Sequence, residues 1–135
     1  MESLWPTLRP DSAPTPLSIL RRQAQLLFRT TKGLLEGEVV TEGREGWFTH
    51  GFFVVAPVLG SFRYHMFDLQ HQVSPLYPVT VMRRGAHPNT VKDKVELRDE
   101  GALIDWLRTR FDEEKPVLEQ LLGDSLPDSE LAEAR

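Results

Sequence analysis

The stretch WFTHGFFVVAPVLGSFRYHMFDLQHQV, from Trp47 to Val73, decides the fold of this chain. It holds five of the seven phenylalanines. Aromatic and β-branched side chains favour the pleated, half-buried surface of a sheet. Pro57 lacks an amide proton and Gly60 adopts backbone angles closed to other residues, so we expect the chain to reverse between them. The stretch therefore predicts two antiparallel strands that form the central hairpin of a sheet.

The second strand of this hairpin presents two different faces, because side chains alternate along a strand. Neither face is wholly apolar. We predict that the face with Phe67, Leu69 and Val73 meets the core, because the other face ends in three polar residues. The predicted core face comprises Arg63, His65, Phe67, Leu69, His71 and Val73, and the other face comprises Phe62, Tyr64, Met66, Asp68, Gln70 and Gln72.

Composition indicates one soluble domain. The 135 residues are 40% hydrophobic, which is enough for a single core. The chain has no cysteine, which excludes disulfides, thiolate metal sites and a cysteine nucleophile. No run reaches the roughly 18 apolar residues of a membrane helix, and the N-terminus lacks the features of a secretory signal. We expect a cytoplasmic protein.

Charge is unevenly distributed along the chain. Residues 1–60 carry six basic and six acidic side chains, residues 61–98 carry six and three, and residues 99–135 carry four and eleven. The segment charges are thus 0, +3 and −7, and together they make the net charge of −4. Such runs are usually solvated faces. An acidic helix that docks on a basic partner is the alternative.

The flanks of the hairpin predict helices and further strands. Residues 1–14 contain three prolines and predict a flexible arm, from which Trp5 and Leu8 are expected to pack onto the domain. Thr15-Pro16 predicts a helix start, and Gly33 its end. Strands are expected over residues 34–41 and 79–83, an exposed loop over 84–90, two helices from Asp99-Glu100 and Lys115-Pro116 to Gly123, and a disordered acidic tail over 124–135.

These elements predict an α+β two-layer sandwich, with one domain over residues 15–123. Apolar and polar side chains alternate over residues 91–98, with an interruption at Asp93. Whether this segment is a strand decides whether the sheet has four strands or five. Every link between strands is too short for a parallel crossover, so the sheet is expected to be an antiparallel meander. The N-terminal helix and the two C-terminal helices can share one face and leave the other face uncovered.

No set of residues predicts catalysis. The chain contains four histidines, His50, His65, His71 and His87, and we expect His50 and His65 to come within diagonal reach across the hairpin. No HExxH pattern or nearby carboxylate accompanies them, so neither a metal nor a cofactor is expected. Ser61 lacks the GxSxG context of a nucleophile, and no glycine-rich stretch carries a Walker lysine.

Basic and aromatic residues on the sheet predict a partner-binding surface. We expect Arg63, Tyr64, His65, Arg83 and Arg84 to lie on one sheet face, where Arg and Tyr are typical of protein interfaces. The leading hypothesis is a non-enzymatic protein-interaction module, self-association included. The order of elements is similar to that of small bacterial adaptor, immunity and chaperone-like domains, and no motif selects among them.

Two other functions stay open at this point. One is a small-ligand-binding or enzymatic domain that uses His50, His65 and Arg63 in a pocket. The other is a module that binds single-stranded nucleic acid through Arg63, Tyr64, Arg83 and Arg84, since guanidinium groups and rings can pair with phosphates and stack on bases. The pI of about 5.6 and the acidic C-terminal third disfavour nucleic acid.

Overall fold

The structure, a computed structural model, describes residues 1–84 and 91–127. Arg84, which was expected to begin a loop over 84–90, is the last residue of a strand; the rest of that loop, with His87, and most of the tail expected over 124–135 lie outside the described residues. The elements follow in the order α1 (Pro16–Thr30), β1 (Glu36–Arg44), β2 (Trp47–Ala56), a 3-10 turn η1 (Pro57–Leu59), β3 (Phe62–Gln72), β4 (Val79–Arg84), β5 (Val91–Leu97), α2 (Glu100–Glu113) and α3 (Lys115–Ser125).

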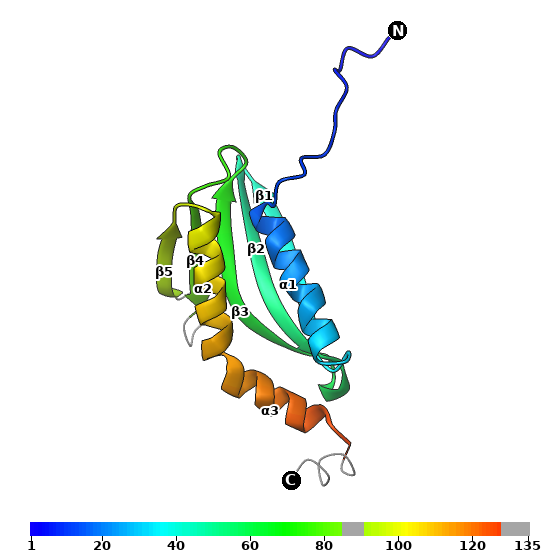
Figure 1. The fold of residues 1–135 in the computed structure, drawn as a ribbon, viewed down its shortest axis with the longest axis vertical. Helices are drawn as coiled ribbons and strands as arrows, with labels where there is room; N and C mark the ends of the chain where they lie inside the picture. The colour runs from blue at the N-terminus through cyan, green and yellow to red at the C-terminus, as the bar shows by residue number, and fades with distance from the viewer. Residues whose placement is uncertain (85–90, 128–135) are drawn as a thin grey trace.

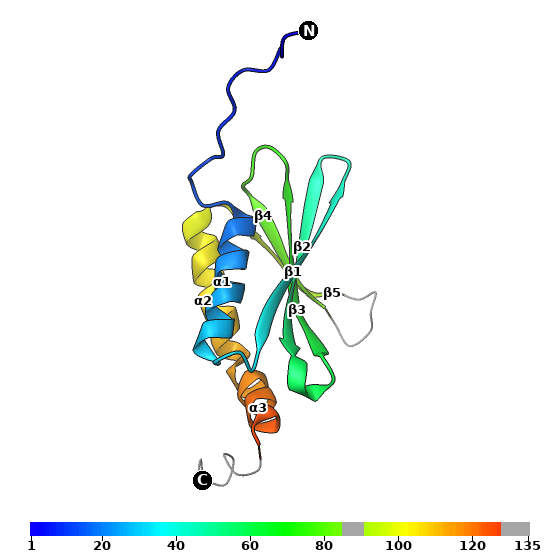
Figure 2. The same ribbon diagram turned by 90° about the vertical axis from the view of Figure 1, so that its right-hand side faces the viewer.

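The five strands form one antiparallel meander in the order β1-β2-β3-β4-β5, as predicted, and residues 91–97 supply the fifth strand. All three helices lie on the same side of the sheet (Figures 1 and 2). The predicted α+β two-layer fold is thus confirmed. We call the sheet surface turned away from the helices the outer face. No helix in the described ranges is long and apolar enough to cross a membrane.

Local capping chemistry positions the helices. The Thr15 hydroxyl accepts a hydrogen bond from the amide of Ser18, and the Ser18 side chain accepts one from the amide of Thr15, which forms a capping box. The carboxylate of Asp99 caps α2 in the same way, by accepting from the amide of Ala102. These two predicted helix starts are therefore confirmed, as is the third, at Lys115.

Two local predictions were wrong. Helix α3 runs through Gly123 to Ser125, whose hydroxyl donates to the carbonyl of Leu121 at 2.7 Å. Glycine tolerates a helical conformation, so its presence alone does not end a helix. Trp5 and Leu8 do not pack onto the domain, since 79% and 74% of their surfaces are exposed. The arm projects away from the sheet and the helices (Figure 1).

A close backbone contact attaches α1 to the sheet. A Cβ atom built on Gly37 of β1 would lie 2.4 Å from the Cα atom of Ala24 in α1. Only glycine permits this approach, because real Cβ atoms are not found at such distances. The contact holds α1 close to the sheet, over a core that includes Leu20, Leu35, Phe52, Phe67, Leu69 and Leu103.

A β-bulge in β3 reverses the alternation of side chains. Phe52 pairs with Phe67, but the next residue of β2, Phe53, pairs with His65, so Met66 is an extra residue in β3. Met66 and Phe67 are both buried. Phe67 and Leu69 lie on the core side, as predicted.

The bulge also accounts for the wrong part of the face prediction. Arg63 and His65 precede it and face the outer side, because uninterrupted alternation does not hold across an inserted residue. Val73 lies beyond the end of β3, and 54% of its surface is exposed.

Candidate functional site

The residues predicted to bind a partner do not share one surface. Arg63 and His65 lie on the outer face. Tyr64 lies on the helix side, where its hydroxyl donates to Glu114 at 2.6 Å. Arg83 also lies on the helix side, where it pairs with Asp93 beside α2. The side chain of Arg84 falls outside the described part of the structure. The prediction of a single basic surface was therefore wrong, because neighbouring residues of a strand point to opposite faces.

Five residues form a connected group on the outer face, which we call the outer-face cluster: Glu38, Phe53, Arg63, His65 and Asp68. The guanidinium of Arg63 donates to Glu38 at 2.6 Å, and its carbon lies 4.2 Å from the centre of the Phe53 ring. The imidazole of His65 stacks on the same ring, with centroids 4.3 Å apart. One aromatic ring thus contacts both a cation and an imidazole.

The base of the cluster is a buried carboxylate. Only 4% of the surface of Asp68 is exposed, and its Oδ1 lies 2.8 Å from Nε2 of His65. A carboxylate accepts, so Nε2 of His65 donates the hydrogen. A Cβ atom on Gly51 would come within 3.0 Å of both Asp68 and the Phe53 ring, so glycine leaves the room that this arrangement needs.

The outer-face cluster contains no hydroxyl or thiol nucleophile. Its members carry carboxylates, a guanidinium, an imidazole and a phenyl ring, and none carries a hydroxyl or a thiol. The carboxylate of Asp68 orients the imidazole of His65, as acid–histidine pairs do in catalytic sites.

A second group of histidines is buried on the helix side of the sheet. Nε2 of His50 lies 2.8 Å from Nε2 of His71, and only 1% and 4% of these two residues is exposed. Nδ1 of His71 lies 2.7 Å from the carbonyl oxygen of Gln72, so this nitrogen must donate. Nε2 of His71 therefore accepts a hydrogen bond from Nε2 of His50. Nδ1 of His50 in turn accepts one from the Thr41 hydroxyl, 2.8 Å away.

Its buried position keeps His50 neutral. Burial is the main cause that lowers the pKa of His50 to about 4, and the electrostatic interactions of His50 with His71 and Arg21 add to it. The predicted proximity of His50 and His65 was wrong, because His50 pairs with Leu69 and lies on the opposite face from His65. In the observed register the histidine within diagonal reach of His50 is His71, two residues beyond its partner Leu69.

The two buried histidines are too close to share a metal ion. An ion between them would need both nitrogens at about 2.0–2.1 Å, on opposite sides or at the corners of a tetrahedron, and this requires a separation well above 2.8 Å. Among the described residues no group of three or more His, Asp or Glu side chains could hold a metal. The histidine pair is best explained as a satisfied polar network at one end of the core.

Tyr64 belongs to a third group, which joins β3 to the junction of α2 and α3. Glu114 accepts from Tyr64 and from Arg110, each at 2.6 Å, and Arg110 also donates to Glu113 at 3.1 Å. Burial and the bond to Glu114 raise the pKa of Tyr64 to about 12. Tyr64 is thus part of the attachment of the helices and is not presented to a partner.

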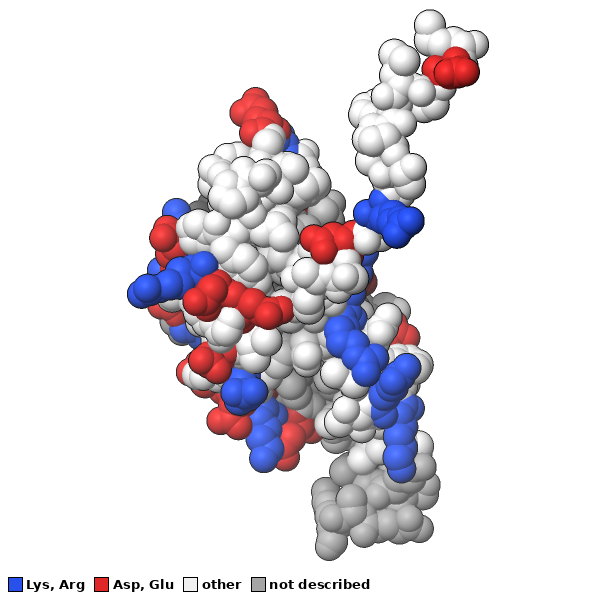
Figure 3. All heavy atoms as spheres, turned by 45° about the horizontal axis from the view of Figure 1, so that its top comes forward, with Lys and Arg blue, Asp and Glu red and all other residues white. Residues whose placement is uncertain are grey.

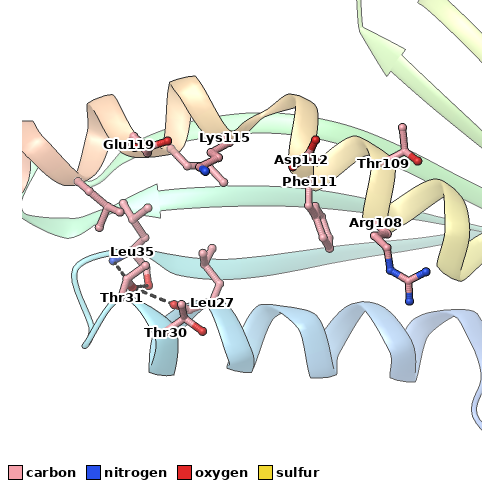
Figure 4. Close-up of a pocket in the computed structure, with 12 residues that line it drawn as sticks. Leu27, Thr30, Thr31, Leu35, Arg108, Thr109, Phe111, Asp112, Lys115 and Glu119 are labelled. Atoms are coloured by element: carbon pink, nitrogen blue, oxygen red, sulfur yellow. Dashed lines mark hydrogen bonds between the residues drawn. The ribbon is translucent and has the colours of Figure 1, made fainter.

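A groove lies between α1 and the α2–α3 pair (Figure 4). It has a volume of about 690 Å³. Leu27 and Phe111 point into it from opposite walls (Figure 4). A smaller cavity of about 200 Å³ adjoins it, between the same helices and the side chains of Phe52 and Met66. We call the two together the interhelical groove, lined by Leu27, Thr30, Leu35, Phe111, Leu118 and Leu122 among others.

The sequence did not predict the interhelical groove. Amphipathic patterns place α1 and α2 on the same face of the sheet, but they carry no information on the spacing of the helices. Comparison of the chain with protein-family models, with curated proteins and with solved structures finds no match. The functional argument therefore depends on the geometry of the outer-face cluster and the groove.

Proposed function

We propose that this chain is a non-enzymatic protein-interaction module of the adaptor, immunity or chaperone-like kind, and that it binds its partner through the outer face. The observation that carries the proposal is the stacking of Arg63 and His65 on Phe53, on a sheet face that no helix of the described chain covers. Arginine and aromatic residues dominate the binding energy of protein interfaces.

The cluster is arranged before any partner binds. Glu38 holds the guanidinium of Arg63, and Asp68 holds the imidazole of His65. Side chains that are already ordered lose little conformational entropy on association, which favours affinity. The exposed ion pair between Arg63 and Glu38 adds little to folding stability, because solvent screens it. The cost of holding these side chains is better explained by recognition than by stability.

The two alternatives expected from the sequence have less support. A pocket that uses both His50 and His65 is incompatible with their positions on opposite faces of the sheet. Nucleic-acid binding by a single patch would need Arg63, Tyr64 and Arg83 on one surface, whereas Tyr64 and Arg83 lie on the helix side. The protein-interaction proposal needs only residues that lie together.

Photo-crosslinking tests which face meets a partner. A photoreactive amino acid replaces Gln70, which lies on the outer face, or Gln25, which is exposed on α1. The two positions carry the same residue type in the wild-type chain, so each is the control for the other. We expect crosslinked proteins from cells at position 70 and none at position 25.

A purified partner then permits an affinity measurement. We expect Arg63→Ala to weaken binding by about tenfold or more, as loss of a hot-spot side chain does. Arg22→Ala, on the exposed surface of α1, is the matched control and should leave the affinity unchanged. Equal crosslinking at positions 70 and 25, or equal affinities of the two arginine variants, would contradict the proposal.

A further inference from the structure

We infer that the N-terminal arm of one copy, residues 1–14, binds in the interhelical groove of a second copy, with Trp5 as its anchor. The inference is independent of the outer face and of any foreign partner. It depends on three observations: the exposed apolar side chains of the arm, the direction in which the arm leaves the domain, and the lining of the groove.

The arm exposes an unusual amount of apolar surface. Leu4, Trp5 and Leu8 have 88%, 79% and 74% of their surfaces exposed. Few charged groups surround them: the arm contains only Glu2, Arg9 and Asp11, and it is largely uncharged along its length (Figure 3). Exposed groups of large apolar side chains usually mark a binding site. Tryptophan is among the residues most often used as an anchor in such sites.

The three prolines of the arm favour an extended conformation over a reversal onto its own domain. Pro6, Pro10 and Pro14 recur every four residues, and each proline holds itself and the residue before it in an extended conformation. At about 3.1 Å per residue, the eleven steps from Trp5 to Pro16 span about 34 Å. The arm extends beyond the N-terminal end of α1 (Figures 1 and 2).

The groove lies at the other end of the same helix. Leu27 and Thr30, which line it, belong to the last turn of α1, so the arm would have to reverse through a proline-rich segment to reach its own groove. An extended arm that points away from its own domain is better placed to reach a second copy. Two copies can exchange arms around a two-fold axis, and each docked arm then raises the effective concentration of the other.

The groove matches the arm in size and chemistry. Its volume of about 690 Å³ falls in the range of roughly 300–1,000 Å³ that is typical of binding pockets. The adjoining cavity of about 200 Å³ is lined mainly by apolar side chains and offers room for one large side chain such as Trp5. The rim carries both charges, with Arg108 and Lys115 able to meet Glu2, and Asp112 and Glu119 able to meet Arg9.

Light scattering of the full-length protein over a concentration series tests the inference. We expect a dimer of twice 15.5 kDa. The arm variant Trp5→Ser should be a monomer, as should the groove variant Leu122→Glu. Trp47→Ser removes an exposed tryptophan elsewhere on the molecule and is the matched control, which should remain a dimer. Circular dichroism shows whether each variant is folded.

Mixing the two monomeric variants gives a sharper test. The Trp5→Ser chain has an intact groove and the Leu122→Glu chain has an intact arm, so a mixture can form one arm–groove contact. We expect heterodimers in the mixture and none in either variant alone. Heterodimer formation would also show that the Leu122→Glu chain is folded and that its monomeric state reflects the altered groove.

Disulfide trapping separates exchange between copies from docking within one copy. The natural chain has no cysteine, so Leu4→Cys combined with Thr30→Cys introduces the only two thiols. We expect oxidation to give a covalent dimer whose disulfides join position 4 to position 30. A covalent monomer would place the arm in its own groove and overturn the inference. A wild-type chain that is monomeric at all concentrations, or a dimeric Trp5→Ser chain, would also overturn it.

Discussion

Acidification should unfold this protein partly through His50. The pKa of His50 is about 4 in the folded protein, whereas the ordinary value of a histidine is 6.5. Between these two values the unfolded chain binds a proton that the folded chain does not, so stability is lost as the pH falls from 6.5 to about 4. Each pKa unit corresponds to about 1.36 kcal/mol, and the full loss is therefore about 3 kcal/mol.

The main reason is that His50 is buried, and both of its ring nitrogens are already hydrogen-bonded. Nδ1 accepts from the hydroxyl of Thr41, and Nε2 donates to His71. A second proton on Nδ1 would face the hydroxyl hydrogen of Thr41 and break that bond. The charge would also be buried, with 1% of the residue exposed, near the positive charge of Arg21.

Urea unfolding of the wild-type protein and of His50→Gln measures this contribution. Glutamine offers a polar amide at the same position but does not titrate. Carboxylates titrate in both proteins, so the difference between the two isolates His50. Between about pH 6.5 and about pH 4.5 we expect the wild type to lose about 2 kcal/mol more of its unfolding free energy than the variant. Equal losses in the two proteins would refute the argument.

Two other predictions concern the packing of the helices. Gly37→Ala should destabilise the protein by about 1–3 kcal/mol, because its Cβ would overlap the Cα of Ala24. Gly123→Ala, in a helix with open space around it, should stabilise the protein by up to about 1 kcal/mol. Urea midpoints measure both changes, and a Gly37→Ala variant of unchanged stability would contradict the close contact. Tyr64→Phe should cost about 1–3 kcal/mol in the same assay, because the buried carboxylate of Glu114 loses a donor, and an unchanged midpoint would show that this bond does not hold the helices.

The helix starts and the strand order could be predicted because local chemistry determines them. Thr15-Pro16 and Asp99 supply caps within three residues of the amides that they satisfy. Short links between strands leave an antiparallel meander as the sheet that the chain can form. The end of α3 was missed for the converse reason, since Gly123 permits a helix end without requiring one.

The candidate site could be predicted only in part. Arg63 and His65 were expected to contribute to a binding surface, and they lie together on the outer face with Phe53. Tyr64 and Arg83 were assigned to the same surface and lie on the other side. Adjacent residues of a strand point to opposite faces, so Tyr64 does not share a face with Arg63 and His65. The bulge at Met66 decides which of the two faces Arg63 and His65 take. Alternation cannot reveal a bulge, because an inserted apolar residue beside Phe67 looks like ordinary core sequence.

The amino-acid sequence by itself determined the element types, the meander and the layer of helices, because each follows from interactions between residues close together in the chain. Only the tertiary structure decided the pairing of His50 with His71, the outer-face cluster and the interhelical groove. These features depend on strand register and on the spacing of α1 from α2. Register and spacing arise from the packing of distant segments, such as the contact of Gly37 with Ala24, which no local pattern encodes.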